Sequence, residues 1–373
     1  HVYFGATDGL VYCLNLIDGA PIWTYQAAPT PLKHMYFENL ESTHPVHGSV
    51  LVEDGKVHLV AGRSMFVDGG IRFLILNAGT GKKLTERVMG DTVPGTDEPL
   101  QMRHEVLNMP VALPDILVGN RENLFLRYQK MDWDGERQDI GFDRGLYGDI
   151  REDIETANSV ADDQTGPDAH LFSGSGFLDD TWWHRTYWIF GKTNAAGWAG
   201  YHRAGRSAPA GRIMSFDDER IYTWGREKKY FKWSKQYRYY LYASDYEYEQ
   251  QWGTTLPILP RAMVLADEKL FLLGPREVLD QEAAVSAMNT VEQQELATMQ
   301  EQELGGENGS VLLCVDPTSG ETTHSFHVDA LPEFDGMVAA YGRIYASTTD
   351  GRILCLGNEG EPMELINATT SGE

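Results

Sequence analysis

One short pattern recurs along this chain and constrains its fold more than any other feature. The pattern begins at Asp8, passes through a glycine turn, an apolar run and a second glycine turn, and ends at Trp23. Further copies occupy residues 308–321 and 350–356, and a looser copy occupies residues 68–84. Self-similar segments distributed along a chain are the signature of a repeat fold, so we expect repeated structural units.

The turns within the pattern predict antiparallel strands. Asp-Gly and Asn-Gly supply the positive φ angles of two-residue hairpin turns, and they occur at residues 8–9, 308–309 and 350–351. The runs after these turns are short and rich in bulky apolar residues, which favours buried strands. The second turn of each unit leads to a fourth, outer strand. Repeated four-stranded antiparallel sheets are the blades of a β-propeller, so the sequence predicts an all-β propeller.

Residues 1–357 are expected to form this propeller, with five or six blades visible. The number depends on whether the incomplete sheets at the two ends combine, and a ring of seven or eight blades remains an open alternative. The expected strands lie at residues 2–6, 11–14, 21–25, 46–53, 56–62, 71–77, 84–89, 116–119, 123–130, 186–191, 212–216, 220–225, 239–242, 262–266, 269–274, 311–315, 337–340, 343–348 and 352–356.

Two segments interrupt the recurring pattern of predicted strands. Residues 132–168 are rich in Asp and poor in aliphatic side chains, which predicts an inserted acidic surface loop. Residues 276–304 space their apolar side chains as a helix does and end at a Gly-Gly pair, which predicts an inserted helix. Residues 358–373 are expected to be a flexible C-terminal tail.

The charge of the chain limits its partners. The formal net charge is −24, which disfavours nucleic acid and anionic membrane surfaces. No apolar run approaches the 18 residues that indicate a membrane span. The sequence starts within a strand pattern at His1, without an initiator Met or a signal peptide, so we expect further chain or domains upstream.

The three cysteines occupy equivalent places in three repeats. Cys13, Cys314 and Cys355 each lie in the strand that follows the first turn. Equivalent positions in different blades point into different spaces between sheets, so we expect buried free thiols rather than a disulfide or a metal site.

The repeat unit, [DN]-G-x-[VIL]-x-C-[LV]-[DN] followed by G-x-x-x-W, resembles that of the pyrroloquinoline-quinone-like (PQQ-like) propeller superfamily. Residues 40–52, 61–71 and 176–185 resemble large extracytoplasmic PQQ-like proteins of the planctomycete type. The chain is more distantly similar to the propeller lipoprotein of outer-membrane assembly and to the quinoprotein dehydrogenases. The resemblance implies a bacterial protein that is periplasmic or otherwise extracytoplasmic.

Two functions are compatible with the resemblance. The first is a non-catalytic binding or scaffold module that holds a protein, glycan or small anionic ligand on one propeller face. The alternative is a quinoprotein oxidoreductase that uses PQQ and calcium to oxidise an alcohol or sugar. The adjacent-cysteine disulfide of those enzymes has no counterpart in this sequence, and no calcium-ligand set can be placed. We therefore assign no catalytic residue, no metal and no cofactor.

Aromatic and basic residues cluster between residues 177 and 212. Arginines beside aromatic rings can bind carboxylates or phosphates and can stack on flat ligands. The alternative is that the tryptophans pack between blades and the arginines pair with the many acids. The ligand-binding candidates in this basic aromatic patch are Trp182, Trp183, His184, Arg185, Trp188, His202, Arg203, Arg206 and Arg212.

A second group of candidates comes from the loops of the second and third blades. His47 and Arg63 are its ligand-binding candidates, and His44, Arg103 and His104 lie in the same loops. The spacing of these histidines matches no zinc pattern, so a metal site is not predicted.

Overall fold

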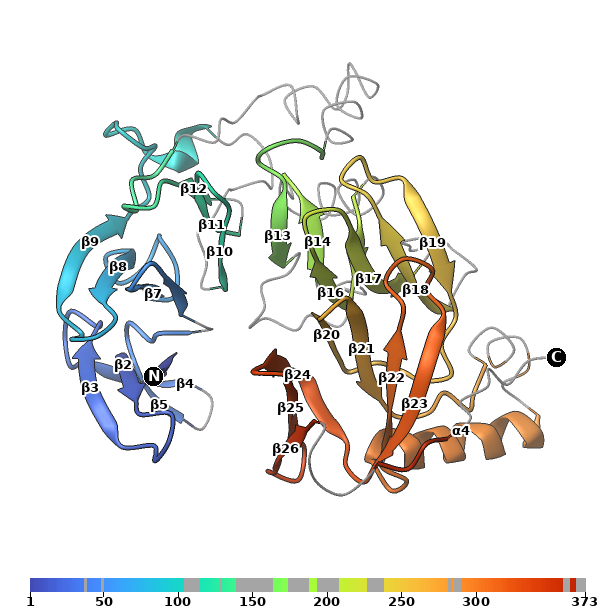
Figure 1. Ribbon diagram of the computed structural model, residues 1–373. Helices are drawn as coiled ribbons and strands as arrows, with labels where there is room; N and C mark the ends of the chain where they lie inside the picture. The colour runs from blue at the N-terminus through green and yellow to red at the C-terminus, as the bar shows by residue number, and fades with distance from the viewer. Residues whose placement is uncertain are drawn as a thin grey trace, which may run out of the picture. The chain divides into compact units, whose positions relative to one another are not determined.

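The computed structural model describes residues 1–36, 39–47, 50–103, 115–127, 129–138, 164–173, 188–192, 208–226, 238–280, 284, 287, 290–357 and 363–366. The chain divides into two compact units, His1–Ala208 and Pro209–Glu373. Nearly all the described elements in both units are strands (Figure 1). The prediction of an all-β propeller built from antiparallel blades is therefore confirmed.

The first unit contains one four-stranded sheet, two three-stranded groups and two further strand pairs. The four-stranded sheet is β6 (Leu51–Glu53), β7 (Lys56–Ala61), β8 (Ile71–Asn77) and β9 (Lys83–Met89). The three-stranded groups are β1 (Val2–Gly5), β2 (Leu10–Leu14) and β3 (Pro21–Gln26), and β10 (Leu117–Gly119), β11 (Leu124–Leu126) and β12 (Gln129–Met131). The pairs are β4 (Lys33–Tyr36) with β5 (Asn39–Ser42), and β13 (His170–Ser173) with β14 (Trp188–Gly191).

The second unit contains two four-stranded sheets and one three-stranded sheet. The first is β16 (Ile213–Phe216), β17 (Ile221–Arg226), β18 (Tyr239–Ser244) and β19 (Gln250–Thr254), and we call it blade 4. The next, blade 5, is β20 (Ala262–Ala266), β21 (Lys269–Gly274), β22 (Ser310–Val315) and β23 (Thr322–Val328). The last is β24 (Pro332–Ala340), β25 (Arg343–Thr348) and β26 (Ile353–Leu356). The first strands of these three sheets, β16, β20 and β24, are neighbours.

The predicted hairpin turns form where two strands flank them. Gly9 and Gly351 have φ angles of 87° and 82° and join β1 to β2 and β25 to β26. Gly309 also has a positive φ, at 69°, but it stands between a helix and β22. The turn at residues 308–309 is thus no hairpin, because the helix is inserted directly before it.

That helix, α4 (Val291–Gly305), starts later than residue 276, where the apolar spacing first becomes helical. Thr290 caps its first turn through its side chain, and Gly306, at φ 79°, closes its C-terminus. Residues 276–280 instead run as a loop, in which Arg276 bridges to Ile258. Ala284 and Ala287 are helical as well, so the predicted helical stretch is wrong for residues 276–280 but not for these two positions.

Several strands were not located from the sequence. The outer strands β19 and β23 are rich in polar residues, and hairpin β4–β5 lies between the strands expected at residues 21–25 and 46–53. The first strands, β1–β3, and the last, β24–β26, each form a three-stranded sheet.

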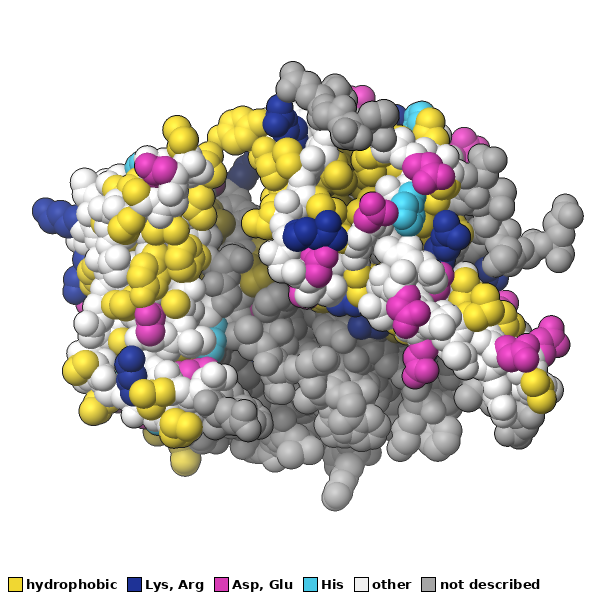
Figure 2. All heavy atoms as spheres, turned by 90° about the horizontal axis from the view of Figure 1, so that it is seen from below, with side chains coloured by type: hydrophobic (Ala, Val, Ile, Leu, Met, Phe, Trp, Pro, Cys, Tyr) yellow, Lys and Arg dark blue, Asp and Glu magenta, His cyan; other side chains and the backbone are white. Residues whose placement is uncertain are grey.

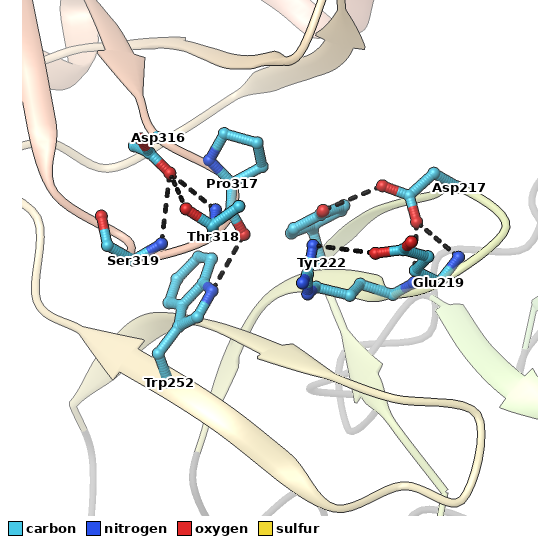
Figure 3. A network of polar contacts seen from close by, with 9 residues as sticks. Asp217, Glu219, Tyr222, Trp252, Asp316, Pro317, Thr318 and Ser319 are labelled. Atoms are coloured by element: carbon cyan, nitrogen blue, oxygen red, sulfur yellow. Dashed lines mark hydrogen bonds and ion pairs between the residues drawn. The ribbon is translucent and has the colours of Figure 1, made fainter.

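Tryptophan side chains form hydrogen bonds between neighbouring sheets of the same unit. Trp23 on β3 donates its indole N–H to the carbonyl oxygen of Ala78 at 2.9 Å. Trp252 on β19 donates to the carbonyl oxygen of Pro317 at 3.0 Å, in the turn between β22 and β23 (Figure 3). In both cases the ring covers a turn glycine, Gly81 or Gly320. The tryptophan that ends the repeat pattern therefore connects one blade to the next.

The cysteines are free, as predicted, but only two are buried. Cys13 is fully buried on β2, and Cys314 is 8% exposed on β22. Cys355 on β26 is exposed, because it alternates with Leu354 and Leu356, which pack against the hydrophobic core on the other face of the sheet. The prediction of burial was wrong for Cys355, since nothing among the described residues covers its face.

Parts of the predicted insertion and tail pack onto sheets. Trp133, in the first part of the acidic segment, packs against the core of the first unit. Arg137 donates to the carbonyl oxygens of Gly90 and Thr92 at 3.1 and 3.3 Å. In the tail, Ile366 donates its backbone N–H to Ser325 of β23 at 3.0 Å. Residues 139–163, 358–362 and 367–373 lie outside the described part of the chain.

Candidate functional site

The antiparallel order of a blade fixes which loops share an end of the sheet. The turn between strands one and two and the turn between strands three and four lie at one end, which we call the turn end. The connection between strands two and three, and the connection to the next blade, lie at the opposite end, which we call the connection end. Residues distant in sequence are thereby brought to a common edge.

Acidic residues concentrate at the turn end of blades 4 and 5. They supply most of the charged groups in the four turns at this end: Asp217, Asp218, Glu219, Asp245, Glu247, Glu249, Asp267, Glu268, Asp316 and Glu321. Some of these acidic side chains accept hydrogen bonds from neighbouring residues. Asp217 accepts a hydrogen bond from the Tyr222 hydroxyl at 2.9 Å, and Asp316 accepts from the backbone N–H of Thr318 at 2.7 Å (Figure 3).

Arginines concentrate at the connection end of the same two blades. We call Arg212, Arg226, Arg238, Arg261 and Arg276 the arginine group. They stand at the start of β16, at the end of β17, before β18, before β20 and after β21. Arg238 and Arg276 are exposed, and the other three are half-buried. The same end also carries the acidic residues of the β21–β22 connection, among them Glu277, Asp280 and the four Glu residues of α4.

The placement of the arginines at one end follows from topology and is not visible as a single patch. On the face shown in Figure 2, side chains of both signs are interspersed with hydrophobic ones over the described surface. The strand order is thus the observation that relates the five arginines to one another.

Aromatic rings accompany two members of the arginine group. The Arg226 guanidinium lies over the Tyr239 ring, 4.6 Å from its centroid, and Tyr239 stacks on Trp224 at 5.8 Å. Arg212 lies 5.9 Å from the centroid of Phe334 on β24. These contacts hold the guanidinium planes in fixed orientations, as cation–π pairs do.

Two carboxyl groups belong to residues near the arginine group, since Arg238 acts on Glu277 and the backbone N–H of Asp335 donates to the carbonyl oxygen of Arg261 at 2.7 Å. Burial raises the pKa of Glu277 to about 7; the negative charge of Asp280 raises it further, and the positive charge of Arg238 opposes the shift. The surrounding protein also raises the pKa of Asp335, which follows Phe334 in a bulge of β24. Both groups take up protons more readily than an ordinary carboxylate, which reduces negative charge near the arginines.

A second cluster lies in the first unit, where two of the motif stretches meet. Arg63, just after β7, pairs with Glu41 of β5 at 2.5 Å between Nη2 and Oε2. The chain from Ser42 to Val46 crosses between the sheets, since Val46 donates to Ala6 and Gly62 donates to Pro45. The predicted neighbours His47 and Arg63 therefore do come together, with Glu41 as a third member that the sequence did not single out.

The electrostatics of this cluster keep its histidines neutral. Burial lowers the pKa of His47, the Arg63 charge lowers it further, and Glu41 opposes the shift. Burial also lowers the pKa of His44, which is 5% exposed. A neutral imidazole beside an Arg–Glu pair can donate and accept hydrogen bonds, which suits a polar ligand.

Most of the basic aromatic patch lies outside the described residues. This applies to Trp182, Trp183, His184, Arg185, His202, Arg203 and Arg206, as well as to His104 and the side chain of Arg103. Trp188 is 4% exposed on β14, and Arg212 starts blade 4 within the arginine group. The binding role of the patch stays a prediction.

The sequence reasoning missed four of the five arginines and Glu277. Arg226, Arg238, Arg261 and Arg276 are isolated in sequence, each separated from the next by at least ten residues. A signal was nevertheless present, because each stands next to a strand boundary at the connection end. Sorting charged residues by the sheet end they occupy would have found them.

The described residues show neither a metal-ligand cluster nor a membrane-spanning helix. They contain no group of three or more His, Cys, Asp or Glu side chains arranged to hold a metal ion. Within the same residues, no helix combines the length and the apolar character needed to cross a membrane.

Comparisons with known proteins identify distant structural neighbours. No family model matches the chain, and no curated protein matches it in sequence. Among solved structures, BamB from Moraxella catarrhalis matches with a TM-score of 0.42 and 10% identity, covering 95% of this chain and 81% of BamB. The dihydro-heme d1 dehydrogenase NirN, solved in complex with DHE, matches with a TM-score of 0.36 and 12% identity over 96% of this chain.

The quinohemoprotein alcohol dehydrogenase from Comamonas testosteroni matches with a TM-score of 0.34 and 14% identity over 92% of this chain. The chain spans 61% of NirN and 49% of this dehydrogenase. Because these TM-scores are below 0.5, the fold assignment rests on the strand pairing within the chain. BamB and the quinohemoprotein alcohol dehydrogenase are thus distant structural neighbours of this protein.

Proposed function

We propose that this protein is a non-catalytic binding module of the PQQ-like propeller type, with the arginine group as its anion-binding site. The ligand is a small anion, or a carboxylate or phosphate carried by a glycan or protein. The site of action is extracytoplasmic, as in the large planctomycete-type proteins that the motif stretches resemble. The observation that carries the proposal is the gathering of five arginines, two of them beside aromatic rings, at the connection end of blades 4 and 5.

In three members of the arginine group, the guanidinium forms no ion pair with a described acidic residue. Arg238, Arg261 and Arg276 form no ion pair with any described residue, although Arg238 acts electrostatically on Glu277. In a chain of net charge −24, acidic partners are abundant, so unpaired arginines at one edge are unusual. Guanidinium groups bind carboxylates and phosphates bidentately, which suits these three arginines to an anionic ligand.

The sequence next to blade 4 adds to the same charge. Arg203 and Arg206 precede Arg212 closely, and Lys228 and Lys229 lie between β17 and β18. The Arg226–Tyr239 and Arg212–Phe334 contacts supply aromatic surface beside two of the cations. Flat or cyclic ligands bearing a carboxylate fit this combination.

Binding of an alginate oligosaccharide, measured by isothermal titration calorimetry, tests the proposal. A neutral dextran oligosaccharide of the same length serves as the ligand control. The double variant Arg238→Gln with Arg261→Gln is expected to weaken alginate binding at least tenfold. The matched control is Arg220→Gln with Arg343→Gln, which removes the same charge at the turn end and is expected to change affinity less than twofold.

Two results would contradict the proposal. Equal losses in both double variants would mean that binding responds only to overall charge. A fall in melting temperature in the Arg238 and Arg261 variant, with no anion bound by the wild type, would make these arginines structural. Exposed charges contribute about 0 to 1 kcal/mol each to stability, so a large fall is not expected.

A further inference from the structure

Strand β24 is bulged near its start, at the connection end. Pro332 and Met337 form regular pairs with β25, but residues 333–336 between them lie outside the ladder. The Ser347 hydroxyl donates to the carbonyl oxygen of Gly336 at 3.1 Å, which holds the bulge against β25. Bulges re-aim side chains and are enriched next to functional sites. The side chains of this bulge are therefore candidates for contact with a ligand.

Asp335 occupies the left-handed position of the bulge. Its φ angle is 56°, in a region that residues other than glycine seldom adopt. Its backbone N–H donates to the carbonyl oxygen of Arg261 at 2.7 Å, so the residue before β20 fixes the backbone of Asp335. A conformation of this kind persists where surrounding contacts impose it, and such residues cluster at ligand-binding and active sites.

The Asp335 carboxyl group has no partner within the described part of the chain. The side chain is exposed, and it forms no hydrogen bond or ion pair with any described residue. Neighbouring protein nevertheless removes part of the hydration of this carboxyl group, which raises its pKa. A carboxylate that has lost hydration without gaining a donor is stabilised when a donor or a cation binds to it.

The surroundings of Asp335 belong to three sheets. The first strands β16, β20 and β24 are neighbours, and each begins at the connection end. Phe334 packs against the hydrophobic core of blades 4 and 5, and the Arg212 guanidinium lies 5.9 Å from the centroid of its ring. Asp335 is thus linked to two members of the arginine group, to Arg261 directly and to Arg212 through Phe334.

We propose that Asp335 binds an ammonium group of the same ligand whose carboxylate binds the arginine group. This role rests on the anion-binding function proposed above, and it narrows the ligand to a molecule that carries both charges. An oligosaccharide in which a uronic acid alternates with an unsubstituted amino sugar has this chemistry. Hydrogen bonds between an ammonium and a carboxylate are charge-assisted and about twice as strong as neutral ones.

The donor set at Asp335 suits an organic ammonium rather than a metal ion. An ammonium group offers three N–H donors, and a single carboxylate accepts from it without further ligands. Calcium takes about six to eight oxygen ligands. Among the described residues, no group of three or more His, Cys, Asp or Glu side chains is arranged to provide them.

Isothermal titration calorimetry of the full chain with two heparosan tetrasaccharides tests this role. Both carry glucuronate carboxylates; the amino sugars are N-acetylated in one and carry free amines in the other, and these amines are protonated at about pH 6.5. The wild type is expected to bind the free-amine form at least fivefold more tightly. Asp335→Asn is expected to remove this preference and to change the affinity for the N-acetylated form less than twofold.

Asp267→Asn is the matched control. Asp267 is also exposed and left-handed, with a φ angle of 48°, but it lies between β20 and β21 at the turn end of blade 5. Asparagine visits the left-handed region as aspartate does, so both variants keep the backbone conformation. Asp267→Asn is expected to retain the wild-type preference for the free-amine form. Urea unfolding of each variant checks that it is folded.

The arginine double variant separates this role from the function on which it rests. Arg238→Gln with Arg261→Gln is expected to weaken binding of both tetrasaccharides at least tenfold, and it keeps the backbone contact between Arg261 and Asp335. If the arginine variant binds like wild type while Asp335→Asn loses the preference, the ammonium site stands and the arginine group fails.

Three outcomes would overturn the role of Asp335. Equal binding of the two tetrasaccharides by the wild type, or an unchanged preference in Asp335→Asn, would do so and leave the arginine group in place. A preference lost equally in Asp267→Asn would show that binding responds only to overall charge. If the wild type binds neither tetrasaccharide, the anion site and the ammonium site both fail.

Discussion

The indole N–H of Trp252 is donated to the carbonyl oxygen of Pro317 across 3.0 Å, which joins the outer strand of blade 4 to a turn of blade 5. The turn is shaped to receive the ring, because its glycine, Gly320, leaves room where a Cβ would lie 2.5 Å from the indole. Trp23 repeats this arrangement in the first unit with Ala78 and Gly81. The glycine and the tryptophan of the repeat are therefore required together.

This pairing predicts that Gly→Ala lowers the free energy of unfolding by different amounts at equivalent turns. Gly19, Gly81 and Gly320 have φ angles of 68°, 68° and 77°, so alanine is strained at each by about 1–2 kcal/mol. At Gly81 and Gly320 the new methyl group also meets a tryptophan, at 2.7 and 2.5 Å, which adds about 1–3 kcal/mol. Denaturant unfolding of the three alanine variants measures the difference.

Gly19→Ala is the internal control, because nothing lies within 4 Å of a Cβ built there. Its destabilisation reports backbone strain alone. Equal losses of unfolding free energy at all three positions would show that the indole contact does not contribute to stability.

The sequence predicted the blades because their signals are local. Turn glycines and apolar runs such as Val11–Leu14 need no information from distant residues. Outer strands such as β19, with the sequence Gln250–Thr254, lack that signal, since their alternation is polar and partner strands determine their position. The arginine group depends on strand order over more than sixty residues, which explains why the sequence alone did not reveal it.

Gln300→Ala is expected to destabilise the region around α4. The substitution leaves the backbone N–H groups of Val278 and Leu279 and the carbonyl oxygen of Arg276 without their partner. Unsatisfied buried groups cost about 1–3 kcal/mol, so we expect faster amide exchange in residues 276–305. Gln302→Ala is the control, because the Gln302 side chain is exposed; equal exchange in the two variants would contradict the anchoring role.

The stability of the second unit is expected to depend on pH through Glu277. Its folded-state pKa is raised to about 7, above that of an unfolded glutamate. The folded state then binds the proton more tightly, so stability falls as pH rises from about 4.5 to 7 and stays low above this range. Glu277→Gln removes the titrating group, so its stability relative to wild type should rise by up to about 3 kcal/mol between pH 4.5 and pH 8.

Urea unfolding at these two pH values measures the change. Asp245→Asn, which removes a carboxylate at the turn end, serves as the control. A stability difference between Glu277→Gln and wild type that is the same at both pH values would exclude Glu277 as the source of the pH dependence.

Arg63→Gln distinguishes a structural pair from a binding residue in the first unit. Glu41 is 8% exposed, so removal of its partner at 2.5 Å should cost about 1–3 kcal/mol. The double variant with Glu41→Gln should recover part of this loss, and the cycle gives the coupling energy. A coupling energy near zero, with normal unfolding, would favour a ligand-binding role for Arg63.

PQQ together with calcium is not expected to raise the melting temperature. The adjacent-cysteine pair and the calcium-ligand set of the quinoprotein dehydrogenases have no counterpart in the sequence. A ligand present at 100 times its Kd stabilises by about 2.7 kcal/mol, which a thermal shift assay readily detects. A saturable shift accompanied by alcohol-dependent reduction of a dye would establish the enzyme function instead.

Because Cys355 is exposed, the rate at which its thiol reacts shows whether that face of the last sheet is covered. Cys13 and Cys314 occupy the same repeat position and are buried, whereas Cys355 is exposed. An alkylating reagent should therefore modify one thiol quickly and two only on unfolding. Whenever another sheet, subunit or ligand covers that face, the fast reaction should slow, so a single rate constant follows the assembly of this protein without any engineered label.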